Sequence, residues 1–188
     1  MAKIINTPLT KEIAGTLESG DRVLLSGTIY TGRDAAHKRL ADMLERGEAP
    51  PFELQNAVIY YVGPCPAKPG QVIGSAGPTT SGRMDVYSPQ LMEKGLRGMI
   101  GKGNRKQFVI DAMIKYDCVY FAAVGGAGAL LAKAIKEAEV VAFPELGPEA
   151  IYRLRVKDFP VTVVIDAKGN DLYKTGREKY GIGAPDLI

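Results

Sequence analysis

The sequence predicts a single α/β domain in which helices pack on a mixed sheet. Helix and strand signals alternate along the 188 residues, and neither an internal repeat nor a low-complexity linker interrupts them. The C-terminal half has a strand–helix–strand order, which joins parallel strands, whereas segments near the middle and the end favour antiparallel pairs. This combination indicates a layered fold with a mixed sheet rather than a purely doubly wound one.

The first predicted elements are a helix, a strand and a second helix. Thr10 is a candidate N-cap for a short amphipathic helix that ends at Gly20. Residues 22–31 are rich in β-branched and aromatic side chains, which predicts a strand. Residues 34–47 give the clearest helical pattern, with apolar side chains on one face and Gly47 at the C-terminal end.

The middle of the chain predicts two buried strands, 57–63 and 71–77, on either side of a proline-rich turn. A helix, a strand, a helix, a strand, a helix, a strand and a hairpin follow, at 89–94, 98–101, 106–115, 118–124, 128–138, 139–143 and 161–173. From 175 to 188 the charges and glycines have no periodic pattern, which predicts a loosely held tail.

Charge and cysteine content limit the classes of function. The 24 Lys and Arg against 21 Asp and Glu leave a net charge of +3 without strong clustering, which argues against a nucleic-acid partner. No apolar run reaches the roughly 18 residues of a membrane span, and the N-terminus lacks the apolar core of a secretory signal. We therefore expect a soluble cytoplasmic protein with free thiols and no membrane partner. Cys65, Cys118 and the single histidine, His37, are too few for a zinc finger or a self-contained iron–sulfur site, so any cluster must come from another chain.

Glycine-containing junctions between predicted strands and helices are the candidate binding sites. In the first, TIYTGRDAAH, the helix N-terminus offers free N–H groups to an anion, and Arg33 adds a planar fork of donors for a carboxylate. His37 lies one helical turn further on the same face. Alternatively, Asp34 caps the helix and Arg33 is solvated.

The second and third junctions also carry candidate carboxylate ligands. GPTTSGRMD places Thr79, Thr80 and Arg83 on one loop, although Thr and Ser also cap helices and Pro enforces turns. In MIGKGN, Lys102 lies between two glycines and is either a point charge for a carboxylate or a solvated turn lysine. The GxxxxGK[ST] spacing of a phosphate-binding loop is not present.

The fourth junction, VGGAGALL, has Gly125, Gly126 and Gly128 in a GGxG spacing rather than the GxGxxG spacing of dinucleotide-binding loops. Close packing of helix on sheet is therefore favoured over binding of NAD. Glu145 is either a general acid or a solvated residue. No Ser–His–Asp, Cys–His or paired-carboxylate set is complete, so anion binding is the chemistry that these residues favour.

Together these strings resemble one known family, the β subunit of two-subunit class I fumarate hydratases, which is the C-terminal domain of the single-chain members. The similar strings are LLSGTIYTGRDAAHKRL, YYVGPCPAKPGQVIGSAGPTTSGRMD, MIGKGN, FAAVGGAGALLAKAI and AFPELGPEAIYRLRVKDFPVTVVIDAKGNDLY. The family includes the β subunit of L-tartrate dehydratase, which shares GTxxxxRDxxHxRL and GPTTSxRM.

The resemblance implies a swivelling β/β/α layered fold with a mixed sheet, formed as one fumarase C-terminal-type domain by residues 1–188. It implies a partner α subunit that holds a 4Fe–4S cluster through three cysteines, so that neither Cys65 nor Cys118 binds iron. The implied reaction is the reversible hydration of fumarate to (S)-malate, a step of the tricarboxylic acid cycle, in a symmetric heterotetramer.

Residue roles follow from the same resemblance. Arg33 and Arg83 match the arginines that hold the carboxylates of the substrate, and Lys102 matches the lysine that completes this grip. Thr79 matches the threonine beside the substrate carbon that takes part in proton abstraction. Because a threonine hydroxyl is a poor base at neutral pH, an acidic partner on the α subunit is expected to activate it.

Asp34, His37 and Thr80 are assigned supporting roles, in which Asp34 and His37 would orient Arg33.

Three alternatives remain at this point: an L-tartrate dehydratase β subunit, a dinucleotide-binding module and a non-catalytic assembly subunit. The glycine before Arg83 and the TIYTGRDAAH string are more similar to the fumarate hydratases than to the tartrate dehydratases.

Overall fold

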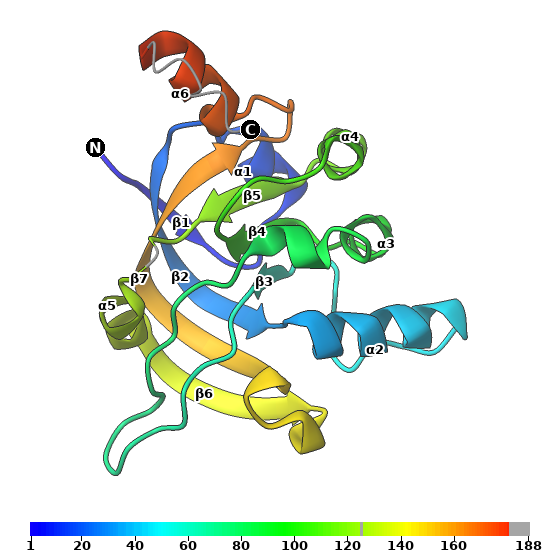
Figure 1. The fold of residues 1–188 in the computed structure, drawn as a ribbon, viewed down its shortest axis with the longest axis vertical. Coiled ribbons are helices and arrows are strands. Elements are labelled where there is room, and N and C mark those ends of the chain that lie inside the picture. The colour runs from blue at the N-terminus through cyan, green and yellow to red at the C-terminus, as the bar shows by residue number, and fades with distance from the viewer. Residues whose placement is uncertain (125, 181–188) are drawn as a thin grey trace, which may run out of the picture.

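The computed structural model describes residues 1–124 and 126–180 (Figure 1). The strands are β1 (Lys3–Asn6), β2 (Arg22–Thr31), β3 (Val58–Tyr60), β4 (Gly98–Gly101), β5 (Val119–Ala122), β6 (Ile135–Ala142) and β7 (Ile151–Ile165). The α-helices are α1 (Lys11–Gly15), α2 (Asp34–Glu45), α3 (Ser88–Glu93), α4 (Gln107–Lys115), α5 (Gly128–Ala134) and α6 (Leu172–Tyr180). Two 3₁₀ helices, η1 (Ser81–Met84) and η2 (Pro144–Glu149), complete the described elements.

The strands form one mixed sheet that closes on itself. Its order is β1-β2-β3-β4-β5-β7-β6, with an additional pairing between β2 and β7. The pairs from β1 through β5 are parallel, and β7 is antiparallel to β2, β5 and β6. β7 has 15 residues, so one of its edges pairs with β2 while the other pairs with β6 and then with β5. The predicted single α/β domain with a mixed sheet is therefore confirmed.

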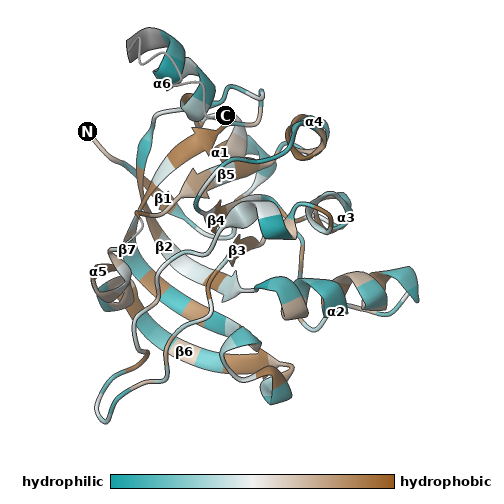
Figure 2. Cartoon of the chain, viewed as in Figure 1, coloured by the Kyte–Doolittle hydropathy of each residue, from teal (hydrophilic) through white to brown (hydrophobic). Residues whose placement is uncertain are grey.

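Two apolar cores lie on the two faces of the closed sheet. The run 57–62 is buried throughout. Alternate side chains of a strand point to opposite faces, and each face of this strand is covered by one of the two cores. Val58 and Tyr60 enter one core, and Ile59 and Tyr61 enter the other. The second core is covered by α2, α3 and α4, which lie along the same side of the parallel strands (Figure 1). Figure 2 shows hydrophobic residues concentrated in β3, β4 and β5, whereas α2 is largely hydrophilic. Each fully buried large apolar side chain contributes about 1.5–3 kcal/mol to stability.

Several predicted elements have different bounds or do not form. Residues 71–77 make no strand, because this segment folds back on its own loop: Gly74 N–H donates to Cys65 O at 3.1 Å, and Cys65 N–H donates to Ser75 O at 2.9 Å. The helix predicted over 128–138 ends at Ala134, where β6 begins and pairs with β7.

The C-terminal part also differs from prediction. The hairpin predicted over 161–173 has its turn, but the second strand is a single bridge between Ile165 and Asp171. The segment predicted as a loosely held tail, from 175 on, is helical as far as Tyr180, as part of α6. The remaining 181–188 lie outside the described residues.

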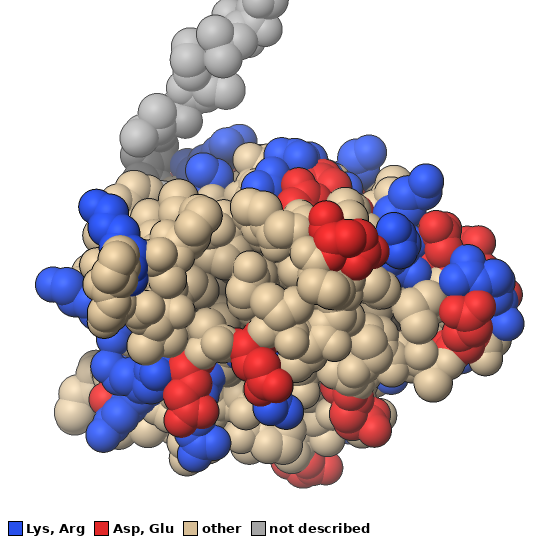
Figure 3. Space-filling view, turned by 90° about the horizontal axis from the view of Figure 1, so that it is seen from below, with Lys and Arg blue, Asp and Glu red and all other residues tan. Residues whose placement is uncertain are grey.

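The described surface carries charges of both signs. On the face in Figure 3, basic and acidic side chains alternate around an uncharged centre. Among the described residues, no helix is both long enough and apolar enough to cross a membrane.

Candidate functional site

The residues singled out in the sequence follow the C-terminal ends of neighbouring parallel strands. Arg33 comes just after β2, Lys102 directly follows β4, and Thr79 and Thr80 lie on the segment between β3 and η1. β2, β3 and β4 are parallel neighbours, so the segments that leave their C-terminal ends emerge at one edge of the sheet. The C-terminal edge of parallel strands is where ligands bind in α/β folds, both in open sheets and in closed barrels.

The segment from Thr79 to Ser81 is paired with the residue that follows β4. Thr79 N–H donates to Tyr61 O at 2.8 Å, and Lys102 N–H donates to Thr79 O at 3.3 Å. Ser81 N–H in turn donates to Lys102 O at 2.9 Å, and Thr80 and Lys102 form a parallel bridge. These backbone bonds fix the second and third junctions next to each other.

A bidentate ion pair joins the first and second junctions. Arg83 Nε and Nη2 donate to the two carboxylate oxygens of Asp34 at 2.8 and 2.6 Å. The sequence suggested that Asp34 orients Arg33. In the structure Asp34 lies 4.0 Å from Arg33 Nε, so its main cationic partner is Arg83. The side chains of Arg83 and Asp34 are 50% and 34% exposed, so the pair contributes no more than about 1 kcal/mol of stability. Its main effect is to fix the direction of the Arg83 guanidinium.

Arg33 has a donor without an acceptor. Glu149 of η2 caps α2, because its Oε2 accepts from Ala35 N–H at 3.0 Å, and its other oxygen lies 3.7 Å from Arg33 Nη2. The cap is thus Glu149 rather than Asp34. Arg33 Nε is buried and has no hydrogen-bond partner among the described residues. An unsatisfied buried donor is costly.

His37 lies beneath Arg33 and is fully buried. Its Nδ1 is 2.9 Å from Arg33 O, and its ring packs edge-on against Tyr61 at 5.1 Å between centroids. Burial lowers the pKa of His37 to about 4, so the imidazole is neutral at pH 7 and Nδ1 donates to the Arg33 carbonyl. The histidine therefore holds the Arg33 backbone and does not face the exposed side of the site.

The lowered pKa of His37 predicts an acid-sensitive fold. In the unfolded chain the imidazole protonates near pH 6.5, whereas in the folded chain it stays neutral down to about pH 4. Between these values the unfolded state binds one more proton, so stability falls as the pH falls, by on the order of 3 kcal/mol in all. Urea unfolding at pH 7 and pH 4 should show this loss in the wild type in excess of the loss in His37→Asn. Equal losses in the two proteins would contradict the prediction.

The fourth junction packs against the second. Ala76 N–H donates to Gly128 O at 3.2 Å, and a Cβ at Gly128 would lie 2.5 Å from Ser75 Oγ and 2.9 Å from Gly77 N. Close packing therefore explains Gly128, as the sequence favoured; Gly125 lies outside the described residues. Glu145 pairs with Arg39 at 3.3 Å on the surface.

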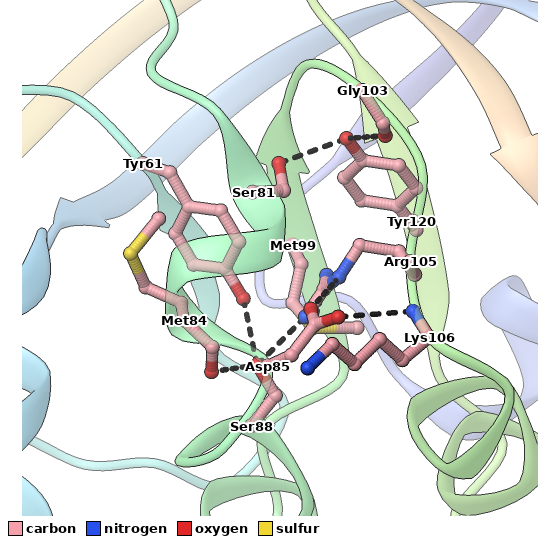
Figure 4. Close-up of polar contacts among 10 residues, drawn as sticks. All are labelled: Tyr61, Ser81, Met84, Asp85, Ser88, Met99, Gly103, Arg105, Lys106 and Tyr120. Carbon is pink, nitrogen blue, oxygen red and sulfur yellow. Dashed lines mark hydrogen bonds and ion pairs between the residues drawn. The ribbon is translucent and has the colours of Figure 1, made fainter. Parts of the chain in front are cut away.

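A buried polar network beneath the site was not predicted from the sequence. It is centred on Arg105 and Asp85 and includes Ser88 and the hydroxyl of Tyr120 (Figure 4). The one available signal was position: Asp85 and Arg105 closely follow the GPTTSGRM and MIGKGN strings. Nothing in the local pattern indicates that these two charges are buried.

Comparison with known proteins gives one consistent family. A family model described as "Fumarase C-terminus" matches residues 2–176. The chain is 43% identical over 175 residues to "Fumarate hydratase class I, aerobic" of Escherichia coli K12, a match that covers 90% of this chain and 32% of that protein. It is 46% identical over 155 residues to the protein of the same name from Salmonella typhimurium, covering 81% of this chain and 27% of that protein.

A third relative is of similar length to this chain. The chain is 41% identical over 186 residues to "Putative L(+)-tartrate dehydratase subunit beta" of Methanocaldococcus jannaschii, covering 96% of this chain and 95% of that protein. The chain therefore spans about a third or less of the two fumarate hydratases and nearly all of the tartrate dehydratase subunit.

Proposed function

The chain belongs to the fumarase C-terminus family, as its motifs predict, and from this membership we propose that it is the β subunit of a hydro-lyase that reversibly hydrates fumarate to (S)-malate. One observation carries the proposal. The loops of Arg33, Thr79, Arg83 and Lys102 meet at the C-terminal ends of parallel strands, where they offer three cations and a hydroxyl. This is the set that a small dicarboxylate and proton transfer at its carbon require.

A partner α subunit completes the enzyme in this proposal. The fumarate hydratases to which the chain is similar are much longer than the matched region, whereas the tartrate dehydratase relative is named as a β subunit of matching length. We propose that the α subunit packs over the exposed Thr80, Arg83 and Lys102 and that the two chains form a symmetric heterotetramer in the cytoplasm.

The three cations divide between the two ends of the substrate. Arg33, whose side chain is 26% exposed, receives one carboxylate through its guanidinium, and Arg83 and Lys102 receive the other. When the carbon next to a carboxylate loses its proton, negative charge develops on that carboxylate in the transition state. Guanidinium and ammonium groups that are already in place stabilise this charge without reorganisation.

A 4Fe–4S cluster does not fit the described residues of this chain. Cys65 is exposed on its loop and Cys118 is buried, where burial raises the pKa of its thiol to about 12 and disfavours the thiolate that iron requires. No group of three or more His, Cys, Asp or Glu side chains within the described ranges is arranged to hold a metal ion. We therefore propose that the cluster is held by the α subunit, and the roles proposed for this chain concern its own side chains.

The test is reconstitution of the two chains. This chain is mixed without oxygen with a cluster-bearing α subunit, and the absorbance of fumarate is followed in both directions. Hydration by the pair and not by either chain alone is the expected result. A pair that contains the cluster but does not convert fumarate would overturn the proposal.

L-tartrate dehydration is the second candidate, favoured by the 95% coverage of the Methanocaldococcus jannaschii subunit. The two substrates differ by one hydroxyl group, which a single polar contact can distinguish strongly. The same reconstituted pair is therefore assayed with L-tartrate and with (S)-malate, and the higher kcat/KM identifies the substrate.

Calorimetry with NAD tests the dinucleotide alternative. No binding is expected, since Gly128 is needed for packing.

Gly63 is predicted to keep room for Arg33. A Cβ at this position would lie 2.7 Å from Arg33 Nη1, 2.9 Å from Arg33 Cδ and 3.3 Å from Pro148 O, so Gly63→Ala must displace the guanidinium. We expect KM for fumarate to rise about tenfold, with little change in melting temperature. Gly82→Ala is the matched control in the same site, because its nearest neighbour, Asn104 O, is 3.7 Å away. Equal KM values for the two variants would contradict the prediction.

A further inference from the structure

A fully buried arginine lies beneath the loops of the proposed site (Figure 4). The side chain of Arg105 is 0% exposed, and that of Asp85 is 1% exposed. Arg105 Nε donates to Asp85 Oδ1 at 2.6 Å, Nη2 donates to Ser88 Oγ at 2.7 Å, and Nη1 lies 3.4 Å from Met99 Sδ. Removing two charges from water is unfavourable, and a pair with these additional bonds is what compensates for it.

Two tyrosine rings flank the guanidinium. Arg105 Cζ is 5.5 Å from the centre of the Tyr61 ring and 5.1 Å from that of Tyr120, which are cation–π distances. The hydroxyl of Tyr120 donates to Gly103 O at 2.9 Å and bonds to Ser81 Oγ at 2.8 Å. Tyr120 thus connects the loop after β4 with η1.

The network contacts both loops next to the proposed substrate ligands. Asp85 is the second residue after Arg83, and Gly103 is the residue after Lys102. Asp85 Oδ2 also accepts from Lys106 N–H at 2.9 Å, which ties the start of α4 to the end of η1. Every bond of the network therefore holds one of the two loops or joins them.

We propose that Arg105 is a positioning residue for the hydro-lyase site, acting with Asp85 and Tyr120 to hold Thr79, Arg83 and Lys102 in one geometry. The proposal rests on the proposed function. A buried ion pair adds little net stability compared with apolar residues of similar volume, so stability alone does not explain it. Loops that carry reacting groups, in contrast, require precise placement, since a shift of about 1 Å can lower a rate by about 100-fold.

The double variant Arg105→Met/Asp85→Asn tests the proposal in the full chain combined with its α subunit. Met fills the space of the aliphatic stem, Asn keeps an acceptor for Lys106 N–H, and neither variant residue is charged, so the fold is expected to persist. We expect kcat for fumarate hydration to fall about 100-fold and the effect on KM to be smaller. Leu17→Ala, which creates a cavity in the other core, is the control for stability.

Hydrogen exchange of this chain alone supplies a readout that does not depend on activity. The amides of Ser81 and Lys102 donate across the two loops, and we expect their exchange to become at least tenfold faster in the double variant and in Tyr120→Phe. In Leu17→Ala, the exchange rates of these two amides, expressed relative to the rate of global unfolding, should be the same as in the wild type.

The outcomes separate the two proposals. If the wild-type pair is active and the double variant keeps wild-type kcat, or if the two amides exchange as in the wild type, the positioning role is overturned. If the wild-type pair shows no activity with fumarate, the proposed function fails, and the exchange experiment still decides whether Arg105 holds the loops together.

Discussion

Replacing Arg83 with alanine is expected to lower kcat/KM for fumarate by on the order of 10²–10³-fold. Truncating a charged, hydrogen-bonded contact to a ligand costs about 2–5 kcal/mol, or roughly 30- to 4,000-fold, and the expected loss lies in the middle of that range. The fold should be nearly unaffected, because Arg83 is half-exposed and Asp34, left without its partner, can be hydrated. Steady-state kinetics of the reconstituted pair, with thermal unfolding of this chain, measure both effects.

Arg39→Ala is the matched control for Arg83→Ala. Arg39 has the same 50% exposure and also pairs with an acidic side chain, Glu145, at 3.3 Å, but it lies outside the three junctions. We expect wild-type kcat/KM for this variant. Arg83→Lys retains the charge without the planar fork and should give an intermediate value. Wild-type activity of Arg83→Ala would instead favour a non-catalytic assembly subunit.

The meeting of the first and third junctions could be anticipated, because Arg33 and Lys102 come just after apolar strands, and parallel neighbours end at the same edge. The place of the second junction could not, because the strand predicted before it, 71–77, does not form, and Thr79 reaches this edge at the end of a long segment without regular structure after β3. The family resemblance assigned the roles. The details of pairing were not predictable, because the Arg83–Asp34 bond joins residues 49 positions apart and depends on how α2 and η1 approach each other.

Burial of charge was the feature that local patterns could not predict. Arg105 lies between two polar residues and Asp85 between Met84 and Val86, so neither environment indicates a buried ion pair. Only the folded arrangement of η1, α3 and β4 encloses the two charges. No local pattern indicates a capping role for Glu149, yet it caps α2 because η2 places it beside Ala35 N–H. The segment 71–77 was predicted as a strand from its apolar content, but its glycine at 74 lets the chain fold back at close range: a Cβ there would lie 2.5 Å from Cys65 O.

Thr79→Val is the second variant for which a large loss is expected. Valine has nearly the same shape and lacks only the hydroxyl, so we expect kcat to fall about 10²–10⁴-fold, the range for loss of a proton-transfer group, while KM changes little. The backbone of Thr79 is held by Tyr61 O and Lys102 N–H, so the loop should not move. Thr79→Ser should recover much of the activity, because it restores the hydroxyl.

The Thr79 hydroxyl needs a nearby carboxylate that can accept its proton. Among the described residues around the site, Asp34 is bonded to Arg83, Glu149 caps α2 and Asp85 is buried with Arg105. Each of these carboxylates is already engaged by donors of this chain that fix its direction, so none of the three is aimed at the threonine hydroxyl. In the proposed complex we therefore expect the activating group to come from the α subunit. If Thr79→Val retains wild-type kcat, the α subunit supplies the base directly and Thr79 only lines the substrate.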